Sequence, residues 1–270
     1  MREKLTHLRA LIRVLLFIAG TLFLVVIQLV WALGTAIFMT RKPRKQSPIV
    51  RLWYMYCVWL SGIKVTVANK RSLSKKQKII LSNHTSYLDI LVLGAAFDSF
   101  FVAKIDIAGW PIFGFLAKVG GTLFISRQPR FIKQQLALLE THLRAGQSLL
   151  IFPEGTTNNG MKLQAFKSSL MNAAFAVEKP PVIQPVSLVY TRMNGKFLET
   201  QSDYDHIAWY DDMLLAPHLW NLFRQRSVEA KITIHSAIRI TPDMDAKSVT
   251  KMAQDEIVEG FKHAHPALQK

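Results

Sequence analysis

The sequence predicts an α/β protein in which a largely parallel central sheet is flanked by helices and preceded by an N-terminal membrane helix or two-helix membrane motif. Two observations carry this prediction. From residue 64 onward, short apolar runs alternate with segments of helical periodicity, and residues 14–39 form a long run without a charged residue. We therefore divide the chain into a membrane-embedded helical segment, residues 1–63, and an α/β domain, residues 64–270.

The net charge of +16 is concentrated at the N-terminal end of the chain. Residues 1–80 hold 15 Lys and Arg against one acid, Glu3, whereas residues 81–270 hold 19 basic and 17 acidic residues. Nucleic-acid binding would need basic residues on a folded surface, so this distribution argues against a nucleic-acid partner and favours anionic lipid headgroups. The single cysteine, Cys57, excludes an internal disulfide framework.

The uncharged run at residues 14–39 would form a helix about 39 Å long, enough to cross a hydrocarbon core of roughly 30 Å. It ends in R-K-P-R-K rather than at a small-residue cleavage site, so we expect it to be retained. Four basic residues precede the run and five lie in residues 41–60, the near balance expected if both ends face the cytoplasm. Residues 48–63 are then either a returning membrane helix or an amphipathic helix packed on the domain.

The elements of the domain follow from changes in the hydrophobic period. Short apolar or alternating runs predict strands at 65–67, 78–83, 100–103, 122–126, 148–152, 182–190 and 228–240. Helical spacing predicts helices near 86–97, 130–145, 163–178 and 246–264. Because strand and helix alternate, the sheet should be largely parallel, and ligands should bind where its strands end.

One polar cluster, N-H-T-S-Y-L-D at residues 83–89, directly follows the strand predicted at 78–83. His84 and Asp89 can meet if the residues between them turn into a helix, so that Asp89 holds one imidazole nitrogen and the other faces the cleft. His84 would then be a general base for a substrate hydroxyl. The alternative is a histidine that caps the following helix.

Two further clusters lie at predicted strand ends. Arg127 closes G-G-T-L-F-I-S-R, and its guanidinium suits a phosphate or a carboxylate, although a strand-end arginine is often a surface residue. The loop F-P-E-G-T-T-N-N-G, residues 152–160, offers backbone N–H groups and the hydroxyls of Thr156 and Thr157 as an anion site. The alternative is a plain turn.

In this order and at these spacings, the clusters resemble the motif blocks of the glycerolipid (lysophospholipid) acyltransferase family, which includes 1-acyl-glycerol-3-phosphate acyltransferase. The matching positions are His84 and Asp89 in N/H-H-x-x-x-x-D, Arg127 in F-I-x-R, residues 152–156 in F-P-E-G-T, residues 182–189 in an apolar block around a proline, and Lys104 with Trp110, Pro111 and Gly114 in A-K-x-x-x-x-x-W-P-x-x-G. The resemblance covers residues 64–190 and implies that residues 64–270 are an acyltransferase catalytic domain.

The resemblance implies that His84 deprotonates a glycerol hydroxyl, which attacks an acyl thioester while Asp89 orients and stabilises the imidazolium. A thiolate leaving group needs little help from an acid, so one base suffices and no acyl-enzyme is required. The absence of G-x-S-x-G argues against a serine hydrolase of the α/β-hydrolase kind.

The resemblance also implies a binding site for the acceptor phosphate, formed by Arg127 and by Gly155 and Thr156 of the F-P-E-G-T loop. Lys104 is a plausible second cation. Glu154 would repel a phosphate, so we expect it to bind an acceptor hydroxyl or to hold Arg127 in place.

The implied reaction transfers a fatty acyl group from acyl-CoA or acyl-carrier protein to 1-acyl-glycerol-3-phosphate, forming phosphatidic acid. The alternatives are another lyso-lipid acceptor, such as lyso-ornithine lipid or a lysophospholipid, and a non-enzymatic membrane adaptor. No cofactor beyond the donor and no metal is expected, because the remaining histidines form no ligand constellation. Residues 208–220 belong to no motif block and are either part of a substrate pocket or a lid. The implied location is the bacterial inner membrane, with the domain on its cytoplasmic face.

Overall fold

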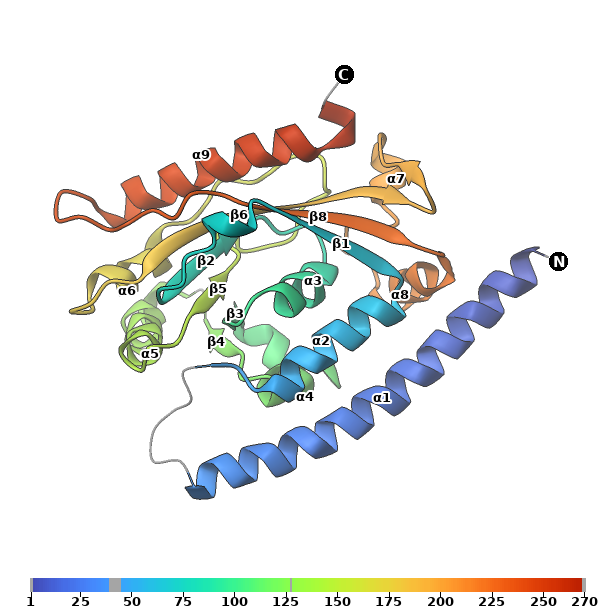
Figure 1. The fold of residues 1–270 in the computed structure, drawn as a ribbon, viewed down its shortest axis with the longest axis horizontal. Coiled ribbons are helices and arrows are strands. Elements are labelled where there is room, and N and C mark those ends of the chain that lie inside the picture. Colours follow the sequence, from blue (N-terminus) through green and yellow to red (C-terminus); the bar gives the residue numbers. More distant parts are fainter. Residues whose placement is uncertain (1, 39–44, 127, 269–270) are drawn as a thin grey trace.

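A computed structural model describes residues 2–38, 45–126 and 128–268. The described residues form an eight-stranded sheet in the order β1-β8-β6-β2-β5-β3-β4, with β7 paired to β6 (Figure 1). The strands are β1 (Ile63–Ala68), β2 (Lys78–Ser82), β3 (Phe100–Lys104), β4 (Leu123–Ile125), β5 (Leu149–Ile151), β6 (Val182–Met193), β7 (Lys196–Phe197) and β8 (Val228–Ile234). Strands β6, β2, β5, β3 and β4 are parallel, whereas β8 is antiparallel to β6, so the predicted largely parallel α/β sheet is confirmed.

Helices cover both faces of this sheet. They are α1 (Arg2–Phe38), α2 (Pro48–Leu60), α3 (Leu88–Ala96), α4 (Phe113–Val119), α5 (Ile132–Arg144), α6 (Asn172–Phe175), α7 (Gln201–Tyr204), α8 (Leu215–Arg224) and α9 (Ala246–Ala264). Successive side chains of β2 point to opposite faces. Ile80 packs into the cluster that contains α2 and α3, whereas Ile79 and Leu81 pack into the cluster that contains α5 and α9.

One predicted helix is largely wrong. Of residues 163–178, only the 3₁₀ turn η4 (Ser169–Met171) and α6 are helical. The preceding segment donates its backbone N–H groups to tertiary partners instead of to its own carbonyls: Gln164 to a Glu154 carboxylate oxygen at 2.8 Å and Lys167 to the Pro153 carbonyl at 2.9 Å. The strand predicted at 228–240 also ends early, at Ile234, and continues only as an isolated bridge at Ile238.

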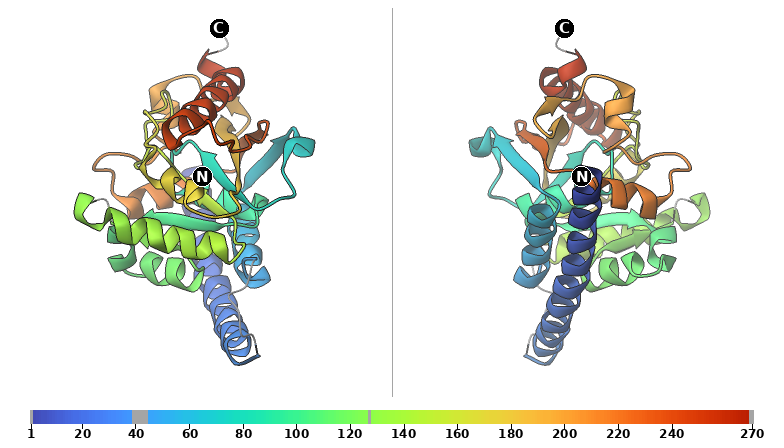
Figure 2. Two further views of the ribbon diagram at one scale, coloured as in Figure 1. Left: turned by 90° about the vertical axis from the view of Figure 1, so that its left-hand side faces the viewer. Right: turned by 90° about the vertical axis from the view of Figure 1, so that its right-hand side faces the viewer.

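Helix α1 runs beside α2 beneath the sheet, on the side opposite α9 (Figures 1 and 2). It is one helix that is long and apolar enough to cross a membrane, by length and composition. It also packs on the domain, because the Tyr56 hydroxyl donates to the Leu16 carbonyl at 2.5 Å and the Trp53 indole N–H donates to the Thr21 hydroxyl at 3.0 Å.

Two basic residues of α1 have a role inside the fold. Arg13 donates to the carbonyls of Phe223 at 3.1 Å and Gln225 at 2.7 Å, and Arg9 donates to the Arg224 carbonyl at 2.9 Å. The last carbonyls of a helix have no partner within the helix. Here the arginine side chains donate to them, and their positive charge interacts favourably with the helix dipole of α8. These two side chains therefore differ from the sequence expectation, which placed the whole N-terminal charge at lipid headgroups.

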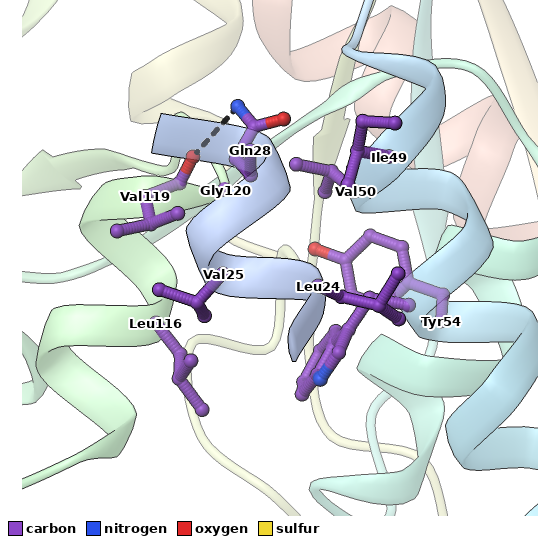
Figure 3. A pocket seen from close by; sticks show the side chains of 10 residues that line it. Leu24, Val25, Gln28, Ile49, Val50, Tyr54, Leu116, Val119 and Gly120 are labelled. Carbon is purple, nitrogen blue, oxygen red and sulfur yellow. Dashed lines mark hydrogen bonds between the residues drawn. The ribbon is translucent and has the colours of Figure 1, made fainter. Parts of the chain in front are cut away.

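Helix α2 packs on the domain, whereas the interpretation of residues 48–63 as a returning membrane helix stays a prediction. One face is buried through Val50, Tyr54, Cys57 and Leu60, as in a helix packed on a domain. The other face leaves Trp59 70% exposed, together with Leu52 and Met55. A mostly apolar pocket lies between α2, α1 and α4 (Figure 3). Leu24, Val50 and Leu116 line it, and the Gln28 side-chain amide donates to the Val119 carbonyl at 3.5 Å. The division into residues 1–63 and 64–270 stays a prediction.

Candidate active site

His84 and Asp89 meet as predicted. Strand β2 ends at Ser82, and the Asn83 side chain then exchanges two 2.8 Å hydrogen bonds with the backbone of Leu188 on β6. Helix α3 begins at Leu88 and carries Asp89 in its first turn, where the carboxylate lies 2.8 Å from His84 Nδ1. Tyr87 is the N-cap residue of α3, so the alternative of a histidine cap is not what the structure shows.

The Asp89 carboxylate is completely buried and has further partners. Its Oδ2 atom accepts the backbone N–H groups of Thr85 at 2.6 Å and Ser86 at 2.9 Å, in addition to facing His84. Its Oδ1 atom accepts the hydroxyl of Tyr190 at 2.7 Å. These contacts orient the carboxylate toward Nδ1 and favour the imidazole tautomer that carries its proton there.

The loop after β5 holds His84 from the other side. The imidazole stacks on the Phe152 ring at 3.9 Å between centroids, with 10° between the planes. The backbone N–H of His84 donates to Glu154 Oε1 at 2.7 Å, and its carbonyl accepts the N–H of Asn158 at 3.0 Å. The side chain is 16% exposed, and no hydrogen bond joins its Nε2 atom to another described residue.

The Glu154 carboxylate is buried and accepts hydrogen bonds from its own loop and from His84. It is 1% exposed, and its Oε2 atom accepts the Asn158 side-chain amide and the Gln164 backbone N–H, both at 2.8 Å. Burial raises the pKa of this carboxyl, and the hydrogen bonds from Gln164, Asn158 and His84 offset part of that rise. Among the described residues, the Glu154 carboxylate holds His84 and its own loop, and its expected contact with an acceptor hydroxyl or with Arg127 stays a prediction.

The four other predicted binding residues stay predictions. Gly155 adopts a left-handed φ of 78°, which suits glycine at this turn, and Thr156 next to it is exposed. Lys104 ends β3 with an exposed side chain whose ammonium group pairs with Asp106. Arg127 lies outside the described residues.

Residues 208–220 pack against the His84 loop. The backbone N–H of Trp209 donates to the Thr85 carbonyl at 3.0 Å, and its ring meets Tyr87 edge-to-face at 6.2 Å between centroids. Tyr87 in turn shares a 3.0 Å hydrogen bond with His218 Nδ1 of α8. This segment, which no motif block contains, is therefore a structural neighbour of the site.

A second histidine, His235, lies between a serine and a glutamate as in a nucleophile site, but the serine is inaccessible to a substrate. His235 Nε2 lies 3.1 Å from the Ser187 hydroxyl, and Nδ1 lies 3.5 Å from a Glu256 carboxylate oxygen. Ser187 is completely buried, and a Cβ atom added to Gly260 of α9 would lie 2.6 Å from its Oγ. No substrate carbonyl can reach this serine. Within the described part of the chain, no group of three or more His, Cys, Asp or Glu could hold a metal ion.

Comparisons with known proteins identify the family of the chain. The profile of the family described as Acyltransferase matches residues 64–189. The chain is 34% identical to the lyso-ornithine lipid O-acyltransferase of Rhodobacter capsulatus, over 76% of this chain and 72% of that protein. It is 33% identical to the enzyme of the same name from Rhizobium meliloti, over 82% of this chain and 76% of that protein.

Two glycerophosphate enzymes are also similar. The chain is 31% identical to the 1-acyl-sn-glycerol-3-phosphate acyltransferase of Neisseria gonorrhoeae, over 57% of each protein. Its fold matches the crystal structure of the 1-acyl-sn-glycerophosphate acyltransferase PlsC of Thermotoga maritima, with a TM-score of 0.66 over 97% of each chain. At 17% identity that likeness shows the fold alone. The family match and the two lyso-ornithine lipid relatives, each aligned over more than two thirds of its own length, establish that the chain belongs to the Acyltransferase family, as an acyltransferase of lyso-lipids.

Proposed function

We propose that this enzyme transfers a fatty acyl group from an acyl thioester to the hydroxyl of lyso-ornithine lipid. The observation that carries the proposal is the extent of the two lyso-ornithine lipid matches, 76% and 82% of this chain, against 57% for the glycerophosphate enzyme of Neisseria gonorrhoeae. The longer alignments include sequence outside the shared motif region at residues 64–189, where differences between acceptors can be encoded.

1-acyl-glycerol-3-phosphate is the second candidate acceptor. It is favoured by the Neisseria gonorrhoeae match and by the predicted phosphate contact of Arg127. The two acceptors differ in charge, because a phosphate monoester is an anion that calls for cations, whereas ornithine brings an amine and a carboxylate. The basic residues that contact the acceptor headgroup should therefore determine which of the two lipids the enzyme prefers.

His84 acts as the general base in the proposed reaction. Its Nε2 atom removes the proton from the acceptor hydroxyl as the oxygen attacks the thioester carbonyl, and Asp89 stabilises the imidazolium that forms. The tetrahedral intermediate collapses, the C–S bond breaks, and the thiolate leaves. It then accepts from Nε2 the proton that came from the acceptor hydroxyl. Acyl-CoA or acyl-carrier protein supplies the thioester, and the proposed chemistry uses no further cofactor or metal.

We also propose that α1 and the exposed face of α2 lie in the bacterial inner membrane and hold the site at its cytoplasmic face. Large apolar side chains are exposed along α1, including Phe23, Val30 and Ile37, and Trp59 extends this surface onto α2. Such a surface in contact with lipid acyl chains avoids contact with water. Both substrates are lipids or carry long acyl chains, so a site at the membrane can receive them.

The test is acyl transfer by the purified enzyme in lipid nanodiscs. Lyso-ornithine lipid, 1-acyl-glycerol-3-phosphate and a lysophospholipid are each offered with acyl-CoA and with acyl-carrier protein. The highest kcat/KM should be with lyso-ornithine lipid. A preference for 1-acyl-glycerol-3-phosphate would overturn this assignment in favour of the second candidate, and Arg127→Ala should then mainly raise the acceptor KM.

The general-base assignment has its own test. His84→Ala should lower kcat by about 10²–10⁴-fold or more with every acceptor, without changing association with the nanodisc. His206→Ala, at an exposed histidine after α7, is the matched control and should keep full activity. Near-normal turnover by His84→Ala would end the assignment.

A further inference from the structure

The two oxygens of Asp89 have different partners. Oδ2 faces His84 Nδ1 at 2.8 Å, and Oδ1 accepts the Tyr190 hydroxyl at 2.7 Å. Tyr190 is 1% exposed, so no water competes for this hydrogen bond. A buried bond between a hydroxyl and a carboxylate is charge-assisted and roughly twice as strong as one between neutral groups.

The fold holds Tyr190 firmly in this position. It lies on β6, which pairs in parallel with β2, the strand that ends just before His84. Its own carbonyl accepts the hydroxyl of Tyr204 at 2.9 Å. Burial and the neighbouring Asp89 raise the pKa of the Tyr190 phenol, so its proton stays in place to be donated.

A proton donated to Oδ1 should change what Asp89 does for His84. It draws negative charge toward Oδ1, so the carboxylate attracts a proton on the imidazole less strongly. It also stops the carboxylate from rotating, which keeps Oδ2 against Nδ1. The titratable groups around this pair are Tyr190 from β6, Tyr87 before α3 and Glu154 after β5.

We propose that Tyr190 is a positioning residue for acyl transfer, which orients Asp89 and thereby sets the basicity of His84. The inference deepens the proposed function and rests on it. A tyrosine that only filled the core would need its ring but not its hydroxyl. The distinguishing change is therefore Tyr190→Phe, which keeps the ring and removes the donor.

The structure offers a matched control for this variant. Tyr54 of α2 is another buried tyrosine of the same hydrophobic cluster, 4% exposed, and its hydroxyl lies beside the Gln46 side chain instead of Asp89. Tyr54→Phe removes the same atom from the same cluster and leaves the contacts of Tyr190 in place. Any general effect of losing a buried hydroxyl should appear in both variants.

The measurement is the pH dependence of kcat/KM in nanodiscs. In Tyr190→Phe the acidic limb should move to higher pH, by a few tenths of a unit to about one unit, and kcat should fall severalfold. In Tyr54→Phe the acidic limb should stay at the wild-type pH. Replacing Tyr190 with 3-fluorotyrosine makes the phenol a stronger donor and should move the limb to lower pH, which also covers the case in which the phenylalanine variant does not fold.

A second measurement reads His84 without turnover. The rate at which diethyl pyrocarbonate modifies the His84 peptide, followed by mass spectrometry across pH, reports the neutral imidazole directly. The same upward shift in Tyr190→Phe would support the role of Tyr190 even if every acceptor assignment failed. Profiles of wild type and Tyr190→Phe that superimpose, or a shift that Tyr54→Phe reproduces, would overturn the proposal.

Discussion

Glu154→Gln is the substitution that best separates a structural carboxylate from a substrate-binding one. In the wild type, Oε1 accepts the His84 N–H at 2.7 Å, and Oε2 accepts the side chain of Asn158 and the backbone of Gln164 at 2.8 Å each. An amide has one acceptor oxygen. If that oxygen keeps the two donors at the Oε2 position, the NH₂ group faces the N–H of His84, and two donors oppose each other.

The expected cost is the loss of one hydrogen bond to a charged group, about 1.5–3 kcal/mol. For a protein of this size, such a loss lowers the melting temperature by roughly 2–4 °C per kcal/mol, or about 3–12 °C in total. Because the lost contact is on the His84 backbone, the imidazole should shift from its position beside Asp89. A displacement near 1 Å can lower the rate about 10²-fold, so kcat should fall while the acceptor KM changes little.

The assay combines thermal unfolding with steady-state kinetics in the same nanodiscs. Glu140→Gln is the control, because Glu140 lies near the surface, 3.8 Å from Arg144, and an exposed ion pair contributes about 0–1 kcal/mol. An unchanged melting temperature and kcat with a raised acceptor KM would refute the structural role and support the expectation that Glu154 binds the acceptor.

Two further predictions concern packing and pH. Gly94→Ala places a Cβ atom 2.5 Å from the Tyr54 ring, so the free energy of unfolding should fall by about 1–3 kcal/mol, as followed by differential scanning fluorimetry. Gly109→Ala is the control and should be near neutral, because nothing lies within 4 Å of its added Cβ atom. Burial lowers the pKa of the His265 imidazole from 6.5, so its contribution to stability is present above that pH and is lost as the pH falls toward the folded-state pKa. The drop in melting temperature between pH 7.5 and pH 5.5 should therefore be smaller in His265→Gln, and an equal drop would contradict this.

The local parts of the site could be predicted from the sequence because short-range geometry determines them. The turn between His84 and Asp89 spans the start of one helix, and the strand before it is a continuous apolar run. The chemistry of these residue types and their spacing were sufficient to predict that the two side chains meet.

The long-range parts could not be predicted in the same way. Tyr190 ends a long apolar run and looks like a core residue until strand order places β6 beside β2. The amphipathic pattern at 163–178 predicts a helix, but Gln164 and Lys167 find stronger partners in the F-P-E-G-T loop. In both cases, a contact between distant segments decides the structure, and no local pattern encodes it.

The arginine contacts between α1 and α8 bear on how the enzyme can be handled. Removing residues 1–45 to obtain a soluble fragment would take away Arg9 and Arg13 and leave the carbonyls at the end of α8 without these donors. It would also remove the partners of Trp53 and Tyr56 on α2, which bond to Thr21 and Leu16 of α1. Since α8 follows the segment that bonds the Thr85 carbonyl, the damage would begin close to the His84 loop. The N-terminal helix therefore supplies contacts that support the fold around the candidate site, and solubility is better sought by reconstitution in lipid than by truncation.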